Sequence, residues 1–190
     1  MIFYNSFFYL YQMISVSKNI QLKEITTQDC TQLYELMQAI YPPAYHHFWT
    51  DKGVWYVDGL YNNKNIHKEL KEAATGYYFV LFKNEAVGIL RVLWNATNEQ
   101  LPYKKPAKLH RIYLHQKAQG NSIGKTLLTW VEHTAKEKQC EVLWLEAMDT
   151  QEQAFKFYKK AGYVPFNQFD LDFPLLLDKH RGLTQVYKEL

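Results

Sequence analysis

The sequence predicts a single α/β domain, built on a mixed β-sheet with helices on both of its faces. A length of 190 residues is typical of one domain. With 47% hydrophobic and 22% charged residues, the chain can bury an ordinary core. Its apolar pattern changes along the chain between the periods of strands and helices, in the order β-α-α-β-β-β-α-β-α-β-β. This order is typical of a sheet covered by helices.

The first expected strand and helix come early in the chain. "IQLKEI", residues 20–25, alternates apolar and polar side chains as a half-buried strand does. "TTQDCTQLYELMQAIY", residues 26–41, has apolar side chains on one helical stripe, and Thr27 is a plausible N-cap. We expect Pro42 and Pro43 to end this helix.

A second helix and a hairpin are expected next. "NIHKELKEAATG", residues 65–76, is amphipathic, and Gly76 is its expected stop. "YYFVLFKNEAVGILRVLW", residues 77–94, predicts two strands joined by a tight turn at Lys83, Asn84 and Glu85.

The second half repeats the alternation of strands and helices. Thr150 and Gln153 predict a capping box for the last helix, and Gly162 predicts its end. The expected elements are a strand at 107–115, a helix at 123–138, a strand at 141–147, a helix at 150–162 and strand-like pieces at 163–173 and 183–190.

The charge and cysteine content exclude several classes of protein. A net charge of +3 is too small to indicate a nucleic-acid or acidic-membrane partner. Cys30 and Cys140 are too few for a disulfide framework and are expected to be buried thiols in a reducing cytoplasm.

The N-terminal segment is apolar but resembles neither a signal peptide nor a membrane anchor. No basic residue precedes the apolar run in "MIFYNSFFYLYQMISVSK", and the run is short for a bilayer span. We expect residues 1–18 to be a non-core extension, with Met13 as a second start, and residues 19–190 to be the domain.

The stretch "QGNSIGKT" between the strand at 107–115 and the next helix indicates a phosphate-binding turn. A nucleotide-triphosphate loop needs a glycine at position 119, where the chain has Gln119. The alternative is a shorter turn, residues 119–125, whose amides and helix N-terminus face a pyrophosphate. A third interpretation is an ordinary turn in which Gly120 and Gly124 serve only the backbone geometry.

Three blocks of sequence support the second interpretation, a turn that binds a pyrophosphate. Residues 119–124 match the pattern [QR]-x-x-G-x-[GA], with Ser122 where the first consensus glycine usually stands. "RIYL", residues 111–114, is similar to a common "RIYV" strand, and "QEQAFKFYKKAGY", residues 151–163, to an "NxxAxxFYxKxGF" block. With these blocks the chain resembles the GNAT superfamily of acyl-CoA-dependent N-acetyltransferases from about residue 20 onward.

The resemblance implies a fold and a cosubstrate. It implies a mostly antiparallel sheet whose fourth and fifth strands, at 107–115 and 141–147, splay apart. The cosubstrate would be acetyl-CoA, with no metal. The residues implied in holding it are Ile112, Tyr113 and Leu114 on the pantetheine arm, Gln119, Gly120, Asn121, Ser122, Ile123, Gly124 and Lys125 on the pyrophosphate, and Gln151 and Tyr158 near the thioester.

The resemblance also implies catalytic roles. Tyr158 would be the general acid, although it also fits the buried stripe of its helix, and the amide of Leu114 is the candidate oxyanion donor. His110 stands where related sequences carry a glutamate, and strand alternation places it on the face of Ile112 and Leu114. His110, which could equally be a structural residue, Glu146 and a water chain ending in solvent are the three candidates for deprotonating the amine.

The aromatic stretch "YPPAYHHFWTDKGVWY", residues 41–56, lies where the superfamily forms its acceptor pocket. Its rings could hold an ammonium by cation–π contact, with Asp51 or Asp58 adding charge, or could be core or a dimer surface. His46 and His47 lack spaced partners and are weak evidence of a metal site.

We therefore expect a cytoplasmic N-acetyltransferase that acts by direct attack on acetyl-CoA. The expected acceptor is a small primary amine, including polyamines, with neither nucleic acid nor membrane as partner and a homodimer left open. A non-catalytic acyl-CoA sensor or scaffold, and a protein N-terminal or lysine acetyltransferase, are the alternatives.

Overall fold

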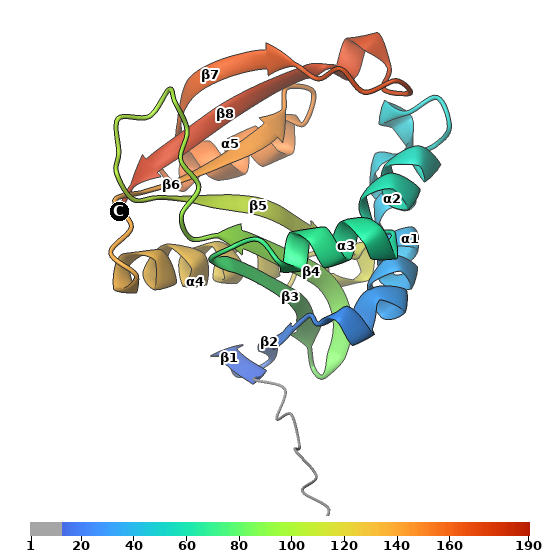
Figure 1. The fold of residues 1–190 in the computed structure, drawn as a ribbon, viewed down its shortest axis with the longest axis horizontal. Helices are drawn as coiled ribbons and strands as arrows, with labels where there is room; N and C mark the ends of the chain where they lie inside the picture. The colour runs from blue at the N-terminus through green and yellow to red at the C-terminus, as the bar shows by residue number, and fades with distance from the viewer. Residues whose placement is uncertain (1–12) are drawn as a thin grey trace, which may run out of the picture.

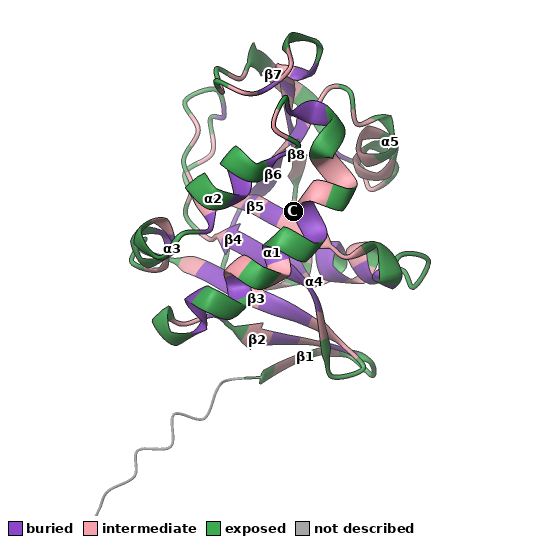
Figure 2. Ribbon diagram, turned by 90° about the vertical axis from the view of Figure 1, so that its right-hand side faces the viewer, coloured by how far each residue is buried: buried purple, intermediate pink, exposed green. Residues whose placement is uncertain are grey.

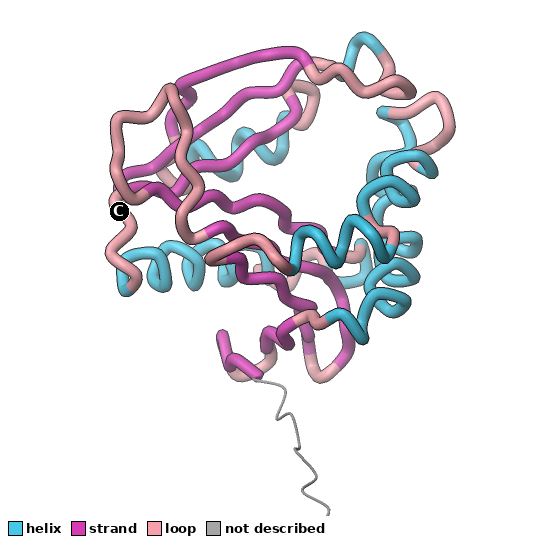
Figure 3. The backbone as a smooth tube through the Cα atoms, in the orientation of Figure 1, coloured by secondary structure: helices cyan, strands magenta, loops and turns pink. Residues whose placement is uncertain are grey.

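The computed structural model describes residues 13–190, which form one eight-stranded sheet flanked by helices (Figures 1 and 3). Its strands are β1 (Met13–Ser17), β2 (Ile20–Glu24), β3 (Thr75–Phe82), β4 (Glu85–Leu93), β5 (Pro106–Leu114), β6 (Val142–Met148), β7 (Val164–Asp170) and β8 (Gly182–Glu189). Its α-helices are α1 (Cys30–Tyr45), α2 (Val54–Leu60), α3 (Asn63–Leu70), α4 (Ile123–Glu137) and α5 (Glu152–Lys160). Among these described residues, no helix is long and apolar enough to cross a membrane.

The sheet is mixed and mostly antiparallel, as predicted. Its strand order is β1-β2-β3-β4-β5-β6-β8-β7. β5 and β6 pair in parallel, and the other neighbouring strands pair antiparallel. The parallel pair is therefore at the centre of the sheet, where α4 connects its two strands.

Two apolar cores cover the two faces of the sheet, and Figure 2 shows buried residues concentrated along its strands. One core packs α4 and α5 against one face, with Leu127 and Val131 fully buried. The other packs α1, α2 and α3 against the opposite face, around Leu33, Met37 and Phe79. The helices on both faces predicted from the sequence are confirmed.

The first strand corrects the expected N-terminal boundary. Met13–Ser17 pairs with β2, so the extension expected to reach residue 18 ends earlier, and its residues 1–12 lie outside the described residues. Ile14 and Val16 pack against the α4-side core, whereas the alternate residues are exposed. This alternation is what an edge strand with one covered face requires.

The long first helix differs from its expected limits at both ends. A 3₁₀ turn, Thr27–Asp29, precedes it, and Thr26 rather than Thr27 caps that turn. The Asp29 carboxylate accepts the Thr26 N–H at 2.9 Å, which completes a capping box. Pro42 and Pro43 lie inside the helix, because its buried stripe extends to Tyr41 and the His46 N–H donates to the Pro42 carbonyl.

The other helix limits also depend on contacts that a local pattern does not contain. α2 was not predicted; the Asp51 carboxylate caps it by accepting the N–H groups of Gly53 and Trp55. α3 ends at Leu70, and Gly76 lies in β3, where a Cβ would meet the Tyr78 hydroxyl at 2.7 Å.

The end of α5 is as predicted but its start is not. Gly162 follows the helix with φ +93°, as its expected stop. The expected capping box is absent, because the Thr150 hydroxyl bonds His180 Nδ1 at 2.9 Å instead.

Candidate active site

A cavity opens where β5 and β6 separate. Their ladder pairs Pro106–Leu109 with Val142–Leu145 and does not continue through the described residues that follow. At the same point Arg91 pairs with Arg111 and Val92 with Leu109, so His110 is an extra residue in β5. Such a bulge bends its strand. The cavity has a volume of about 340 Å³.

The separation leaves main-chain groups of β5 without a neighbouring strand. The His115 N–H donates to the Val87 carbonyl at 2.8 Å. Because bonding alternates along an antiparallel pair, the N–H groups of Ile112 and Leu114 then point away from β4, toward the open side. An extended chain can bond to them as an added strand does.

The cavity brings together side chains that the sequence analysis singled out. It is lined by His110, Ile112, Tyr113, Glu146, Gln151 and Tyr158, besides the aromatic and aliphatic groups described below. Leu114 and residues 119–125 do not line it. They lie together at its end, since a Cβ on Gly124 would be 3.8 Å from Leu114 Cδ1.

Residues 119–125 form the turn at the start of α4, called the anion site below because the sequence predicts that it holds a pyrophosphate. Gly120 and Ser122 have positive φ, and no side chain caps the helix. Since its first backbone bond runs from the Thr126 N–H to the Ser122 carbonyl, the amides of residues 123–125 have no intrahelical acceptor. Free amides at a helix N-terminus bind phosphate groups. The Asn121 amide, which donates to the carbonyls of residues 118 and 119, holds the loop.

Tyr158 presents a protonated hydroxyl to the cavity. Burial, together with nearby Tyr45, raises the pKa of the Tyr158 hydroxyl well above its usual value. Its hydroxyl takes part in none of the hydrogen bonds found within residues 13–190. Gln151 lies one residue before α5 and also lines the cavity.

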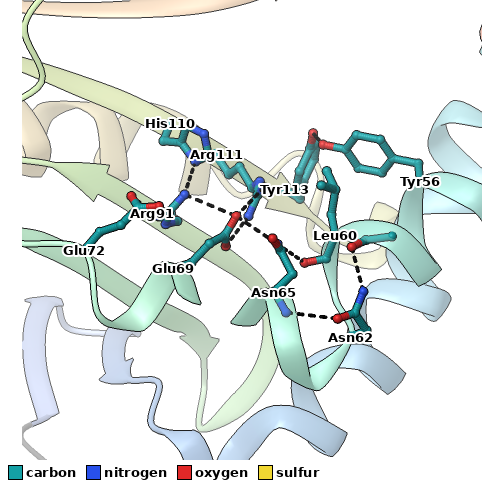
Figure 4. A network of polar contacts seen from close by, with 11 residues as sticks. Tyr56, Leu60, Asn62, Asn65, Glu69, Glu72, Arg91, His110, Arg111 and Tyr113 are labelled. Atoms are coloured by element: carbon teal, nitrogen blue, oxygen red, sulfur yellow. Dashed lines mark hydrogen bonds and ion pairs between the residues drawn. The ribbon is translucent and has the colours of Figure 1, made fainter. Parts of the chain in front are cut away.

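His110 lies on the opposite face of the sheet from the predicted one. The bulge turns it toward Arg91, whose Nη1 lies 2.7 Å from His110 Nδ1 (Figure 4). Arginine is only a donor, so Nδ1 accepts and the ring proton is on Nε2. Burial and the charges of Arg111, Arg91 and Lys108 lower the pKa of His110 to about 2. His110 is therefore a neutral imidazole, which makes it a poor general base.

Glu146 lies on β6, directly after the last residue that pairs with β5. Its Oε2 is 2.8 Å from Lys108 Nζ, and its Oε1 accepts from Gln185 Nε2 at 2.9 Å. The side chain remains partly exposed and lines the cavity. Two partners fix the orientation of this carboxylate, while its remaining lone pairs are available to a donor.

A buried charge network supports the bulge from the side of α3 (Figure 4). Glu69 accepts two bonds from Arg111, at 2.7 and 2.8 Å, and lies 3.4 Å from Arg91. Glu72 takes the other end of Arg91 at 2.7 Å. This network could not be predicted from the sequence, because Glu69 and Arg111 are far apart along the chain and glutamates on an amphipathic helix usually face water.

Five rings of the aromatic stretch at 41–56 line the cavity, and four of them, Tyr41, Phe48, Trp49 and Tyr56, also belong to the buried core on this face of the sheet. Asp51 and Asp58 do not: Asp51 caps α2 and Asp58 accepts from the Tyr34 hydroxyl. His46 Nδ1 bonds the Pro42 carbonyl and His47 packs against Phe48. Within residues 13–190 there is no group of three or more His, Cys, Asp or Glu side chains suited to a metal ion.

The family of the chain follows from its sequence match over this fold. The model of the acetyltransferase (GNAT) family matches residues 31–163, which include β5, the anion site, Glu146 and Tyr158. The chain belongs to the GNAT family. The resemblance drawn from the three sequence blocks is thus confirmed.

One curated relative of this GNAT protein is an uncharacterized N-acetyltransferase in the pepI 3′ region of Lactobacillus delbrueckii subsp. lactis. It is 26% identical over 114 residues, which are 60% of this chain. The match spans 65% of the length of that relative.

Solved structures share the fold at low sequence identity. The PaiA N-acetyltransferase from Thermoplasma acidophilum, in complex with coenzyme A, has a TM-score of 0.67 at 18% identity, over 90% of this chain and 99% of that one. The acetyl transferase from Salmonella typhimurium that modifies the N-terminal serine of ribosomal protein L7/L12 has a TM-score of 0.70 at 15% identity, over 94% and 99%. A mutant of the spermidine N-acetyltransferase SpeG from Vibrio cholerae has 0.63 at 14% identity, over 91% and 95%.

Proposed function

We propose that this GNAT protein transfers an acetyl group from acetyl-CoA to a primary amine by direct attack, without an acyl-enzyme. One observation carries the proposal. The opening between β5 and β6 has unpaired amides at Ile112 and Leu114, an anion site at one end and Tyr158 with Glu146 in the cavity wall. A long arm with a phosphate group at one end and a thioester at the other fits this arrangement.

The carrier would lie along β5 in the opening. The free amides of residues 123–125 and the Lys125 side chain would hold the pyrophosphate. The main chain of Leu114 would bond the pantetheine arm as an added strand. The thioester would then reach the cavity, which has Ile112, Gln151 and Tyr158 in its wall.

The residues of the cavity supply what acyl transfer needs. The amine nitrogen bonds the thioester carbonyl carbon, and the carbonyl electron pair moves to oxygen, where the Ile112 N–H stabilises the charge. We assign this role to Ile112 instead of Leu114 because Leu114 does not line the cavity. The C–S bond then breaks, and the Tyr158 hydroxyl gives its proton to the sulfur. Glu146 takes the proton that the amine loses, directly or through water.

No thiol of the chain is suited to be a covalent nucleophile. Cys30 donates to the Thr27 carbonyl and Cys140 to the Trp94 carbonyl, and neither lines the cavity. Burial raises the pKa of both thiols, which favours the unreactive protonated form.

Calorimetric titration with acetyl-CoA, free CoA and ATP–magnesium tests the proposal, on the wild type and on Gly124→Glu and Gly124→Ala. There is room for a Cβ at Gly124, so alanine is a matched control and glutamate adds charge to the anion site. We expect acetyl-CoA binding that Gly124→Ala retains and Gly124→Glu abolishes. Binding of ATP–magnesium instead, or of no acyl-CoA, would overturn the proposal.

A turnover assay separates the enzyme from a non-catalytic acyl-CoA sensor. The enzyme releases CoA only when an amine is added, and Tyr158→Phe lowers that rate. If the protein is a sensor, the wild type and Tyr158→Phe bind acetyl-CoA equally well and neither releases CoA.

A further inference from the structure

The acceptor side of the cavity has an aromatic wall. Its rings come from the α1–α2 region, from β5 and from the segment after β7, namely Tyr41, Tyr45, Phe48, Trp49, Tyr56, Tyr113 and Phe173. The rings of Tyr41 and Tyr56 stack at 4.2 Å, and Trp49 stacks on Phe173 at 6.0 Å. This mutual packing holds the wall in place.

The segment after β7 lies beside the connection between α1 and α2 (Figures 1 and 3). Leu176 forms a bridge with Trp49, and the Thr50 N–H donates to the Leu175 carbonyl at 2.9 Å. Leu171 and Leu176 from this segment add aliphatic surface to the lining. The cavity is thus bounded by apolar side chains from segments that are far apart along the chain.

Several polar atoms of the aromatic wall bond to one another. The hydroxyls of Tyr56 and Tyr113 are 2.9 Å apart, and Trp49 Nε1 donates to the Tyr41 hydroxyl at 3.1 Å. These pairs use part of the hydrogen-bonding capacity of the wall, which leaves mainly ring surface for an occupant.

The charges around the cavity suit a single cation. Glu146 is the one carboxylate in the lining formed by residues 13–190, and it is shared with Lys108. Arg111, which also lines the cavity, has its charge balanced by Glu69. A second or third ammonium on one acceptor would find no further carboxylate in the wall, and Arg111 and Lys108 would repel it.

We propose that the acceptor is a small monoamine with an aromatic or branched apolar body. This inference rests on the proposed function. The apolar body would lie among the rings, where its burial contributes the binding energy, and the amine would reach Glu146 and the thioester. A cavity of about 340 Å³ suits a small molecule better than a folded protein's chain end.

The test compares kcat/KM for three acceptors: 2-phenylethylamine, spermidine and a short peptide with an N-terminal serine. Each rate is measured as CoA release at saturating acetyl-CoA. We expect 2-phenylethylamine to exceed both others by roughly tenfold or more, as one buried ring provides. A higher kcat/KM for spermidine or the peptide would overturn this inference and leave the proposed function standing. If none of the three amines produces CoA release, both this inference and the proposed function are overturned.

A pair of variants locates the effect in the aromatic wall. Phe173→Ala removes a half-buried ring of the lining, and Phe169→Ala removes an exposed ring of β7 outside it. We expect Phe173→Ala to raise KM for 2-phenylethylamine several-fold more than KM for spermidine, and Phe169→Ala to change neither. An equal effect of the two variants would contradict the assignment.

Discussion

Arg91 Nη1 donates a hydrogen bond of 2.7 Å to Nδ1 of His110, the bulged residue of β5. The bond fixes the neutral tautomer of a histidine whose pKa is lowered to about 2 by burial and by neighbouring cations. A general base that deprotonates the acceptor amine needs a pKa near the working pH. His110 is instead a positioned N–H donor at the point where the two central strands separate.

The lowered pKa of His110 makes a prediction about stability against pH. The unfolded chain binds a proton at about pH 6.5 and the folded chain does not, so the free energy of unfolding falls as pH drops below 6.5. Between pH 7 and pH 5 this loss is roughly 2 kcal/mol. His110→Asn keeps an acceptor for Arg91 and removes the titration, so urea unfolding should show a smaller loss of stability over this range. His133→Asn, at an exposed site, is the control and should behave as the wild type.

Tyr158→Phe should lower kcat about 100-fold, because it removes the proton donor to the departing thiolate. The affinity for acetyl-CoA should not change, since the phenyl ring remains in the wall of the cavity. Tyr163→Phe is a matched control: its ring lies 5.7 Å from that of Tyr158, but its hydroxyl donates to Glu132 outside the cavity. Stopped-flow CoA release measures both variants, and equal rates in Tyr158→Phe and the wild type would exclude the acid role.

Glu146→Gln should lower kcat by a similar factor. The glutamine keeps the shape of the side chain but cannot take a proton from the amine. Lys108→Met tests the ion pair alone, because it removes the partner of Glu146 and leaves the carboxylate that would accept the proton. A full rate in Glu146→Gln would show that a water chain deprotonates the amine.

Much of the fold could be predicted from local patterns because its strands and helices are set by period and by turn residues. The turn at Lys83 and Asn84 has two positive φ values, and α4 extends over nearly all of its predicted length. The splay of β5 and β6 was expected only from the three family blocks. Neither composition nor periodicity contains that information.

The parts that could not be predicted depend on contacts between distant residues. Strand alternation placed His110 with Ile112, but one extra residue in β5 reverses the face, and that bulge is visible only in the pairing with Arg91. The prolines of α1 were expected to end it, but packing of Tyr41 outweighs the local signal. Asp51 and Asp58 appeared available to a substrate, yet each is used by a neighbouring backbone or hydroxyl group.

The left-handed conformation of Ser122 makes a prediction for the anion site. Its φ is +55°, a region that glycine adopts freely and that β-branched residues rarely tolerate. Ser122→Gly should bind acetyl-CoA at least as tightly as the wild type, because relief of strain offsets the added freedom of glycine. Ser122→Val should lower the free energy of unfolding by roughly 2 kcal/mol and weaken acetyl-CoA binding. Calorimetry and thermal unfolding measure both, and a valine variant equal to wild type would contradict the loop conformation.

Glu69 should be the most sensitive position of the buried network. Glu69→Gln leaves Arg111 as a buried cation whose strongest partner is gone, which should cost about 3 to 5 kcal/mol of unfolding free energy. Glu72→Gln is the matched control, since its carboxylate is partly exposed and water can replace it at Arg91. Chemical denaturation should therefore give clearly different free energies of unfolding for the two variants.

Because the network supports the bulge at His110, Glu69→Gln should also lower kcat at temperatures where the variant remains folded, whereas Glu72→Gln should not. Equal stability of the two variants would mean that the network does not hold the bulge.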